Sequence, residues 1–331
     1  MIHPINKVKA LGLCSGGLDS ILSGVVLKQQ GIHVEWISFE TPFFSAEKAQ
    51  KASKMTNIPL IIKNITSEYL PMLKNPPCGY GTEMNPCLDC HALMFKIAGS
   101  VMNELGFNFL FSGEVLGQRP MSQTKNSLRY VEKKSGFEGY ILRPLSAKRL
   151  PETIPESSKL INRDNLLDIA GRGRKIQIAL AKEFGINEYP APAGGCLLCD
   201  KGYSDRLRDF FQYNDSWNEK DFELLKHGRH FRIDAKTKLV IGREEKDNEN
   251  ILKYFDKEND IILQVDKIPG PIGLIFKATP DSDIELASSI CASYSKADLN
   301  IPADILIESE NINKIIRIKF TNKEEYKKFL I

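Results

Sequence analysis

The sequence lacks several features that would assign it to a specialised class of protein. It has no apolar run of the roughly 18 residues that a membrane-spanning helix needs, so we expect no membrane partner. The segment Met1-Ile2-His3-Pro4 has no apolar core of the kind found in signal peptides, which predicts a cytoplasmic location. The formal net charge is only +3, which does not by itself indicate a nucleic-acid partner but allows one where basic residues cluster.

What is present is the composition of an ordinary globular protein. Hydrophobic residues make up 42% of the 331 residues and charged residues 26%, and this length suffices for two domains with their own cores. Thiols stay mostly reduced in the cytoplasm. The seven cysteines are therefore interpreted as ligands, nucleophiles or core residues before disulfides are considered.

Strands and helices alternate along the first part of the sequence. The apolar patterns predict strands over 8–14, 33–39, 59–63 and 107–111, and helices over 19–30, 46–55 and 91–105. Residues 160–184 read as two helices that are broken at 171–173. Such alternation predicts an α/β fold, a parallel sheet with helices on both faces, in which ligands bind beyond the carboxyl ends of the strands.

The character of the sequence changes near residue 201. We expect a first domain over 1–200 and a smaller α+β domain over 201–331. The second domain is richer in charge, with short strands predicted over 229–233, 239–242, 261–265 and 315–320 and a helix over 286–297.

A turn of small and polar residues follows the first predicted strand: Ser15, Gly16, Gly17, Leu18, Asp19 and Ser20. A strand, such a turn and a helix N-terminus together aim backbone N–H groups at phosphate oxygens, and adjacent glycines let the backbone come close to an anion. Asp19 suits a bound Mg²⁺. The alternative is an ordinary turn in which Asp19 or Ser20 caps the helix. No Walker A pattern is present, because no Gly-Lys-Ser/Thr follows.

Two Cys-x-x-Cys pairs stand far apart in the sequence. Cys87 and Cys90 come just before the helix predicted from residue 91, and Cys196 and Cys199 lie in a proline- and glycine-rich loop that closes the first domain. Such a pair can present two sulfurs to one metal. Four interpretations stay open: a zinc ion held by all four, an iron–sulfur cluster held by three or four, a redox pair that carries a persulfide, or four cysteines with no joint role.

The turn at 15–20 has the spelling SGGxDS of the PP-loop of ATP-pyrophosphatases, enzymes that split ATP into AMP and pyrophosphate. The segment 112–118, SGEVLGQ, continues to Ser122-Gln123-Thr124 and resembles the TGExLGQ…SQT loop of the ThiI family of tRNA 4-thiouridine synthases. The segment 141–145 resembles that family's RPL segment. These motifs occur in the order in which the family has them, and the resemblance covers about residues 5–200.

The resemblance implies a PP-loop domain of the adenine-nucleotide alpha-hydrolase-like fold and ATP-dependent thiolation of a tRNA uridine. It implies that the PP-loop holds ATP and Mg²⁺, with Gly113 and Gln118 near the nucleotide and Phe39 lining the adenine pocket. The cysteines also resemble those of 2-thiouridine synthases, which makes Cys90, together with Cys87, and Cys196 or Cys199 the sulfur-transfer candidates. In cluster-dependent thiolases three cysteines hold a 4Fe-4S cluster, two of them from a Cys-x-x-Cys pair, which here implies Cys87, Cys90 and Cys196 or Cys199; zinc remains the alternative metal. The sulfur donor would be a cysteine desulfurase or inorganic sulfide.

The sequence also departs from the family. It begins almost directly at the PP-loop strand, without a THUMP-containing region, has no rhodanese-like extension, and has one extra residue between GQ and SQ. Its C-terminal part resembles the NFACT-R RNA-binding domain, with basic residues interleaved with aromatic ones at 206–243. Two other functions are therefore considered: a PP-loop enzyme that adenylates a small molecule and has a structural zinc, and a non-catalytic RNA-binding module.

Overall fold

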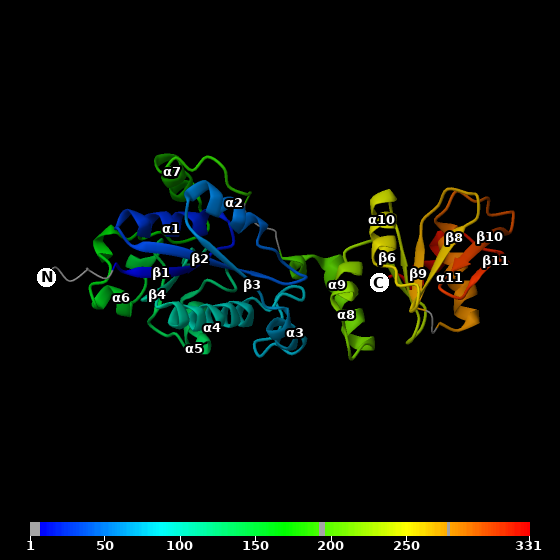
Figure 1. Ribbon diagram of the computed structural model, residues 1–331, viewed down its shortest axis with the longest axis horizontal. Coiled ribbons are helices and arrows are strands. Elements are labelled where there is room, and N and C mark those ends of the chain that lie inside the picture. Colours follow the sequence, from blue (N-terminus) through cyan, green and yellow to red (C-terminus); the bar gives the residue numbers. More distant parts are fainter. Residues whose placement is uncertain (1–6, 192–195, 277–278) are drawn as a thin grey trace. The chain divides into compact units, whose positions relative to one another are not determined.

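The computed structural model describes residues 7–191, 196–276 and 279–331 (Figure 1). The chain divides between Cys199 and Asp200 into two compact units. The segment at the N-terminus that was compared with a signal peptide, and residues 192–195 of the proline- and glycine-rich loop, lie outside the described residues. Within the described part of the chain, no helix is both long and apolar enough to cross a membrane.

The first unit is built on a five-stranded parallel sheet, which confirms the predicted fold class. Its order is β3-β2-β1-β4-β5, so the chain steps outward from β1 first in one direction and then in the other. The direction of the chain thus switches between β1 and β4, and open α/β sheets bind ligands beyond the strand ends at such a point. The strands are β1 (Lys9–Leu13), β2 (His33–Glu40), β3 (Leu60–Asn64), β4 (Phe109–Ser112) and β5 (Ile141–Leu142).

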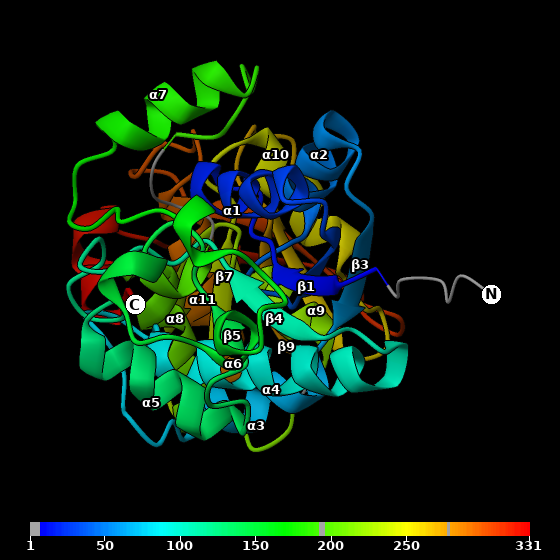
Figure 2. The same cartoon turned by 90° about the vertical axis from the view of Figure 1, so that its left-hand side faces the viewer.

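Helices cover both faces of this sheet. Figures 1 and 2 show α1 (Leu18–Gln29), α2 (Glu47–Thr56) and α7 (Lys175–Glu183) on one side of it. On the other side lie α3 (Thr66–Lys74), α4 (Cys87–Leu105) and α5 (Lys125–Ser135). The shorter elements are α6 (Ile154–Ser157) and the 3-10 turns η1 (Ala147–Arg149), η2 (Arg163–Asn165) and η3 (Leu197–Cys199).

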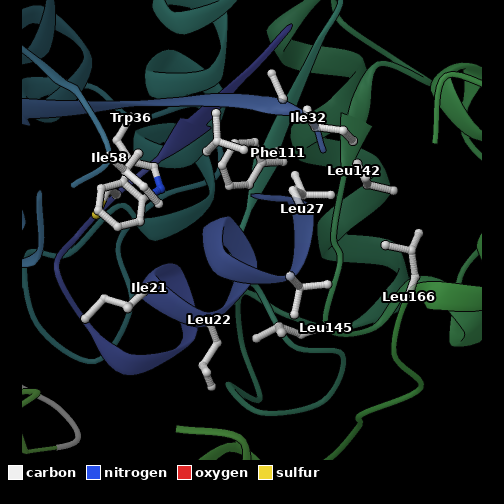
Figure 3. Packing of buried hydrophobic residues seen from close by; sticks show 14 of the residues in the cluster. Ile21, Leu22, Leu27, Ile32, Trp36, Ile58, Phe111, Leu142, Leu145 and Leu166 are labelled. Atoms are coloured by element: carbon white, nitrogen blue, oxygen red, sulfur yellow. The ribbon is translucent and has the colours of Figure 1, made fainter. Parts of the chain in front are cut away.

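One hydrophobic cluster of the first unit lies between α1 and the sheet. Ile21 and Leu22 on α1 belong to one buried cluster with Trp36 and Phe111 on the strands (Figure 3). Gly24 permits this packing, because a Cβ there would lie 2.8 Å from the Trp36 ring. Burying such large side chains is the main favourable contribution to folding. The helix that follows the PP-loop is thereby fixed against the centre of the sheet.

Two predicted elements of this unit need correction. Helix α4 begins at Cys87 rather than at residue 91, so the first cysteine pair lies inside the helix and not before it. The first of the two helices predicted within 160–184 is wrong, and only α7 forms there as a full helix. The amides of Leu167 and Ile169 donate instead to the carbonyls of Pro144 and Leu145, each at 2.9 Å. Backbone pairing across the chain has replaced the i to i−4 bonds of a helix.

The second unit contains a six-stranded sheet whose neighbouring strands all run antiparallel, in the order β11-β10-β8-β9-β7-β6. The sequence patterns predicted four of these strands but missed β9 and β10, and they placed α11 five residues too late at its start. The strands are β6 (Arg229–Arg232), β7 (Lys238–Ile241), β8 (Asp260–Val265), β9 (Gly273–Phe276), β10 (Ala303–Glu308) and β11 (Asn313–Ile318). The helices are α8 (Lys201–Tyr213), α9 (Glu219–Leu224), α10 (Glu245–Lys253), α11 (Asp281–Ser293) and the 3-10 segment η4 (Lys323–Phe329).

Two apolar clusters hold this second unit together. The larger one joins Ile290 of α11 to Ile261 on β8 and Ile305 on β10. The smaller one joins Ile251 of α10 to Val240 of β7. Two buried thiols belong to the cores: Cys291 is fully buried in the larger cluster, and Cys14 is nearly so in the first unit, so both pack as small hydrophobic residues.

Candidate functional site

The loops after β1 and β4 touch each other directly. Leu13 and Ser112, the last residues of the two strands, are paired in the sheet. A Cβ on Gly113 would lie 2.4 Å from the backbone of Asp19 and 2.4 Å from that of Ser20. Only glycine fits at this position without a shift of one loop. The structure thus brings the SGGLDS and SGEVLGQ motifs together at the switch point of the sheet.

The turn at 15–20 has an open helix start. Helix α1 begins at Leu18 with Gly17 as its N-cap, and no side chain caps it. The alternative in which Asp19 or Ser20 caps the helix is therefore wrong, and Ser20 instead donates to the Gly17 carbonyl at 2.8 Å. Gly16 has φ +71°, and a Cβ there would lie 2.2 Å from the Lys48 backbone. Uncapped N–H groups at a helix start can bind an anion.

A chain of side-chain amides orients Asp19. Gln118 Nε2 donates to Asp19 Oδ2 at 2.7 Å, and Gln177 Nε2 donates to Gln118 Oε1 at 3.2 Å. Gln177 lies on α7 and is fully buried. Among the described residues, Asp19 Oδ1 is buried without a hydrogen-bond partner. A carboxylate oxygen held in place and left unpaired fits a hard cation such as Mg²⁺.

A buried ionic network lies beside these loops. Glu114 accepts hydrogen bonds from Arg143 Nε at 3.0 Å and from Ser112 Oγ at 3.1 Å, and it lies 2.9 Å from His91 Nδ1. Burial alone would raise the pKa of Glu114, but Arg143 and His91 outweigh it and lower that pKa to about 2. Arg143 also pairs with Glu132 on α5. Arg143 is therefore part of a buried ionic pair and not of a surface one.

The two cysteine pairs converge in space. Tyr69 on α3 is buried, and its hydroxyl lies close enough to Cys90, Cys196 and Cys87 for these thiols to raise its pKa, although burial is the larger cause. The second pair reaches this place because the Leu197 amide donates to the Phe43 carbonyl at 3.0 Å. The Phe43 ring in turn lies 5.8 Å from the Tyr69 ring. Residues far apart in the sequence thus share one neighbourhood.

The four thiols have unlike environments. Burial raises the pKa of Cys90 to about 12. Cys196 and Cys199 share a hydrogen bond, which raises the pKa of Cys196 and lowers that of Cys199 to about 6, with the Arg119 charge acting in the same direction on Cys199. Cys199 is exposed and Cys196 only partly so. The shared hydrogen bond therefore favours the thiolate form on the more accessible Cys199 and the neutral thiol on Cys196.

The arrangement of the donor groups decides whether a metal fits this site. Among the described residues, no three His, Cys, Asp or Glu side chains are grouped so that they could hold a metal ion. Metal ligation by Cys87, Cys90, Cys196 and Cys199 stays a prediction, and no chemical step below depends on it.

The sequence patterns do not predict several residues of the site. Tyr69 and Gln177 belong to no motif, and they act only through packing that the fold creates. Glu114 lies within the SGEVLGQ motif, and His91 directly follows Cys90. Their positions within or beside a motif are the signal that could have identified both residues. Phe39, expected near the adenine, is 4% exposed near the end of β2.

The basic residues of the second unit are largely engaged in pairs. Arg232 and Lys238 both bind Asp209, Arg243 binds Asp247, and Arg229 lies over the Tyr294 ring. Phe210 and Phe231 are buried. The alternating basic and aromatic pattern at 206–243 therefore forms, in large part, an aromatic core under a paired charged surface.

Comparisons with known proteins match the two units separately. The family described as thiamine biosynthesis protein (ThiI) matches residues 6–161, and the NFACT protein RNA binding domain matches residues 228–330. A probable tRNA sulfurtransferase of Oceanobacillus iheyensis is 28% identical over 46% of this chain and 38% of its own length. One of Alkaliphilus metalliredigens is 31% identical over 42% of this chain and 36% of its own length. The chain thus spans less than two-fifths of the length of these relatives.

Among solved structures, a predicted subunit of tRNA methyltransferase from Methanocaldococcus jannaschii is similar over 53% of this chain and 76% of its own length, at 16% identity and a TM-score of 0.35. Because that score is low, the fold assignment rests on the strand order and not on this likeness. The two family matches divide the chain: its N-terminal part matches the ThiI family, and its C-terminal part matches the NFACT RNA-binding family.

Proposed function

We propose that the protein is an ATP-dependent tRNA sulfurtransferase that converts a uridine carbonyl into a thiocarbonyl. The observation that carries this proposal is the connection between its two motif sites. Gln118 bonds Asp19 in the PP-loop, and Glu114 of the same loop pairs with His91, which directly follows Cys90. The names of the curated relatives, tRNA sulfurtransferases, support the same reaction.

The switch point between β1 and β4 is proposed to bind ATP. The uncapped amides of the PP-loop, from Ser15 to Ser20, would bind the phosphates, and Asp19 would bind the accompanying Mg²⁺. Gly113 and Gln118 border the same loop, and Phe39 remains the candidate for the adenine pocket. The uridine carbonyl oxygen attacks the α-phosphorus of ATP, and pyrophosphate leaves. That oxygen is a poor leaving group by itself, but it can then leave the uridine carbon as part of AMP.

Sulfur is proposed to arrive as a persulfide on Cys199. The Cys199 thiolate takes a sulfane sulfur from a persulfide donor, which is left with a thiol; a cysteine desulfurase is the donor class that we propose. The terminal sulfur then forms a bond to the activated uridine carbon, and the bond from that carbon to the AMP oxygen breaks. The exposed thiolate of Cys199 supports this role, because the thiolate is the nucleophilic form.

The uridine is then still joined to Cys199 through a disulfide bond. We propose that Cys196, deprotonated as it attacks, displaces the thiouridine sulfur from Cys199 Sγ. A Cys196–Cys199 disulfide forms, the thiouridine is released, and a thiol reductant restores the pair. Cys90 lies close to both cysteines and is the second candidate for this resolving step. The alternative to a resolving role for Cys90 is that Cys87 and Cys90 act as metal ligands.

The second unit is proposed to bind the tRNA. Its match to an RNA-binding family supports this. The identity of the uridine is left to experiment.

The test compares Asp19→Ala with Asp164→Ala. Asp164 is an exposed carboxylate of the same unit that lies in η2, away from both motifs. Each variant replaces the wild type in cells that have no other copy, and the thiouridines of total tRNA are measured by mass spectrometry. We expect Asp19→Ala to abolish one thiouridine and Asp164→Ala to preserve it. Intact thiolation in both variants would refute the proposal.

A further inference from the structure

The second unit contains a cavity that the proposed chemistry does not use. It has a volume of about 330 Å³ and lies between α8, α9 and the strands β6, β7 and β9. Small-molecule sites begin at roughly 300 Å³, so the cavity can hold one small planar group. Three cationic side chains and one carboxylate line it, namely Arg232, Lys236, Lys238 and Asp221.

Two aromatic side chains flank this cavity and remain exposed. Tyr213, the last residue of α8, is 40% exposed, and Phe276, the last residue of β9, is 36% exposed. Both line the cavity. Most large apolar side chains of this unit are buried in its core, so two exposed rings at one cavity are a sign of a binding surface. Aromatic faces at such a place can stack on a planar base.

Asp209 holds two of the cavity's cations in place. Arg232 donates from Nε and Nη2 to the two carboxylate oxygens of Asp209, at 2.9 and 2.8 Å, and its guanidinium lies 4.3 Å from the centre of the Tyr213 ring. Lys238 Nζ donates to Asp209 at 2.9 Å and is 6% exposed. Each cation has N–H groups beyond those that bind Asp209. These donors suit a phosphate oxygen or a base carbonyl.

One residue that lines the cavity, His230, has a buried ring nitrogen without a hydrogen-bond partner among the described residues. His230 is 1% exposed, and its Nε2 lies 2.8 Å from the His227 carbonyl, so Nε2 carries the proton. Burial holds the pKa of His230 well below its usual range, so the ring is neutral. Its Nδ1 is then an acceptor, and it makes no hydrogen bond to any described residue. A buried acceptor without a partner suits a ligand that brings an N–H group.

We propose that this cavity binds one unpaired nucleobase of an RNA strand together with its adjoining phosphate. Stacking rings, fixed donors and one unpartnered acceptor are together what a base requires, because it is planar and carries both acceptors and N–H groups on its edges. A duplex keeps its bases stacked and paired, so the cavity selects single-stranded or looped segments. This inference rests on the proposal that the second unit binds tRNA, and it assigns the place of contact.

The experiment measures the binding of the full chain to a labelled single-stranded RNA oligonucleotide by fluorescence anisotropy, at fixed salt. The variants are Tyr213→Ala and Phe276→Ala. The matched control is Ile315→Ala, an exposed apolar residue of the same unit that does not line the cavity. We expect each ring variant to weaken binding about tenfold, in keeping with the loss of one base stack. The control and a duplex of the same sequence should show no such dependence on the rings.

Two outcomes overturn the inference. One is unchanged RNA affinity in both ring variants while their thermal unfolding matches the wild type. The other is ring-dependent binding of a free nucleoside monophosphate without binding of the oligonucleotide, which would make the cavity a small-molecule site. A loss of tRNA thiolation is read separately, because Asp19→Ala removes turnover but leaves this cavity intact. Failure of the cavity and failure of the thiolase proposal are thereby distinguished.

Discussion

The side-chain amide of Gln118 donates a 2.7 Å hydrogen bond to the carboxylate of Asp19, and it joins two motifs that are 99 residues apart. One carboxylate oxygen is thereby fixed, and the other is left unpaired among the described residues. A carboxylate held in this way can bind a cation without first being ordered. This relationship leads to the first prediction.

Gln118→Ala should slow the release of pyrophosphate from ATP by roughly tenfold to a hundredfold, because a hydrogen bond to a charged group contributes about 1.5–3 kcal/mol. Gln177→Leu, which removes the support behind Gln118, should have a smaller effect in the same direction. The measurement is pyrophosphate release in the presence of tRNA. Gln50→Ala, an exposed position on α2, serves as the control. Equal rates in Gln118→Ala and Gln50→Ala would show that the amide does not act on Asp19.

Gly113→Ala should impair both folding and turnover. A Cβ at this position would lie 2.4 Å from the PP-loop backbone, so one of the two loops must move. Overpacking of this kind costs about 1–3 kcal/mol. The comparison is Gly173→Ala, where a Cβ meets nothing within 4 Å. Thermal unfolding and pyrophosphate release should both separate the two variants, and matching behaviour would contradict the close contact of the loops.

Alkylation should identify Cys199 as the reactive thiol. Its pKa of about 6 means that its rate of reaction with iodoacetamide rises as the pH passes through 6 and then levels off, because the thiolate is the reacting form. Cys90, with a pKa of about 12, should stay slow throughout that range. Mass spectrometry of the labelled peptides follows each site.

The companion variant is Cys196→Ala. It removes the hydrogen bond that is the main cause of the low pKa of Cys199, so the midpoint of the alkylation curve should move toward the ordinary cysteine value of about 8.5. Arg119→Ala should move it in the same direction by less. If Cys196 proved to be the thiol that reacts at low pH, the assignment of the nucleophile would be reversed.

Glu114 should contribute to stability in a way that depends on pH. Its pKa is lowered from 4.5 in an open chain to about 2 in the folded protein, so its contribution is present above pH 4.5 and is lost as the pH falls toward 2. Glu114→Gln leaves Arg143 buried with one partner fewer, and breaking a buried pair typically costs about 3–5 kcal/mol. Denaturant unfolding of wild type and variant should differ most at neutral pH and converge in acid. A difference that is constant with pH would show that the carboxylate is not the source.

Much of the first unit could be predicted from the sequence because its strands and helices are marked by local patterns. The apolar runs before Ser15 and Ser112 identify buried strands, and the glycine-rich turns after them identify the edge where ligands bind. The start of α4 was placed four residues late, because Cys87 and Cys90 resemble a ligand pair in a loop more than the first turn of a helix.

The rest of the site depends on contacts between distant residues, which leave no local signal. Tyr69 lies near both cysteine pairs because the Leu197 amide binds the Phe43 carbonyl and so brings the second pair to this place. Gln177 reaches Gln118 only because α7 packs on α1. The helix predicted before α7 does not form for the same reason. The spacing of its apolar residues suits a helix, but its backbone amides donate to the carbonyls of Pro144 and Leu145 instead.

The most direct test of the central claim is thiolation in a purified system. The full chain is incubated with ATP, Mg²⁺, unmodified tRNA, a cysteine desulfurase with cysteine and a thiol reductant, and the tRNA nucleosides are then analysed by mass spectrometry. We expect a thiouridine that requires ATP, appears together with AMP, and is lost in both Asp19→Ala and Cys199→Ser. Formation of AMP without any thiouridine, or a thiouridine that survives in Cys199→Ser, would contradict the account.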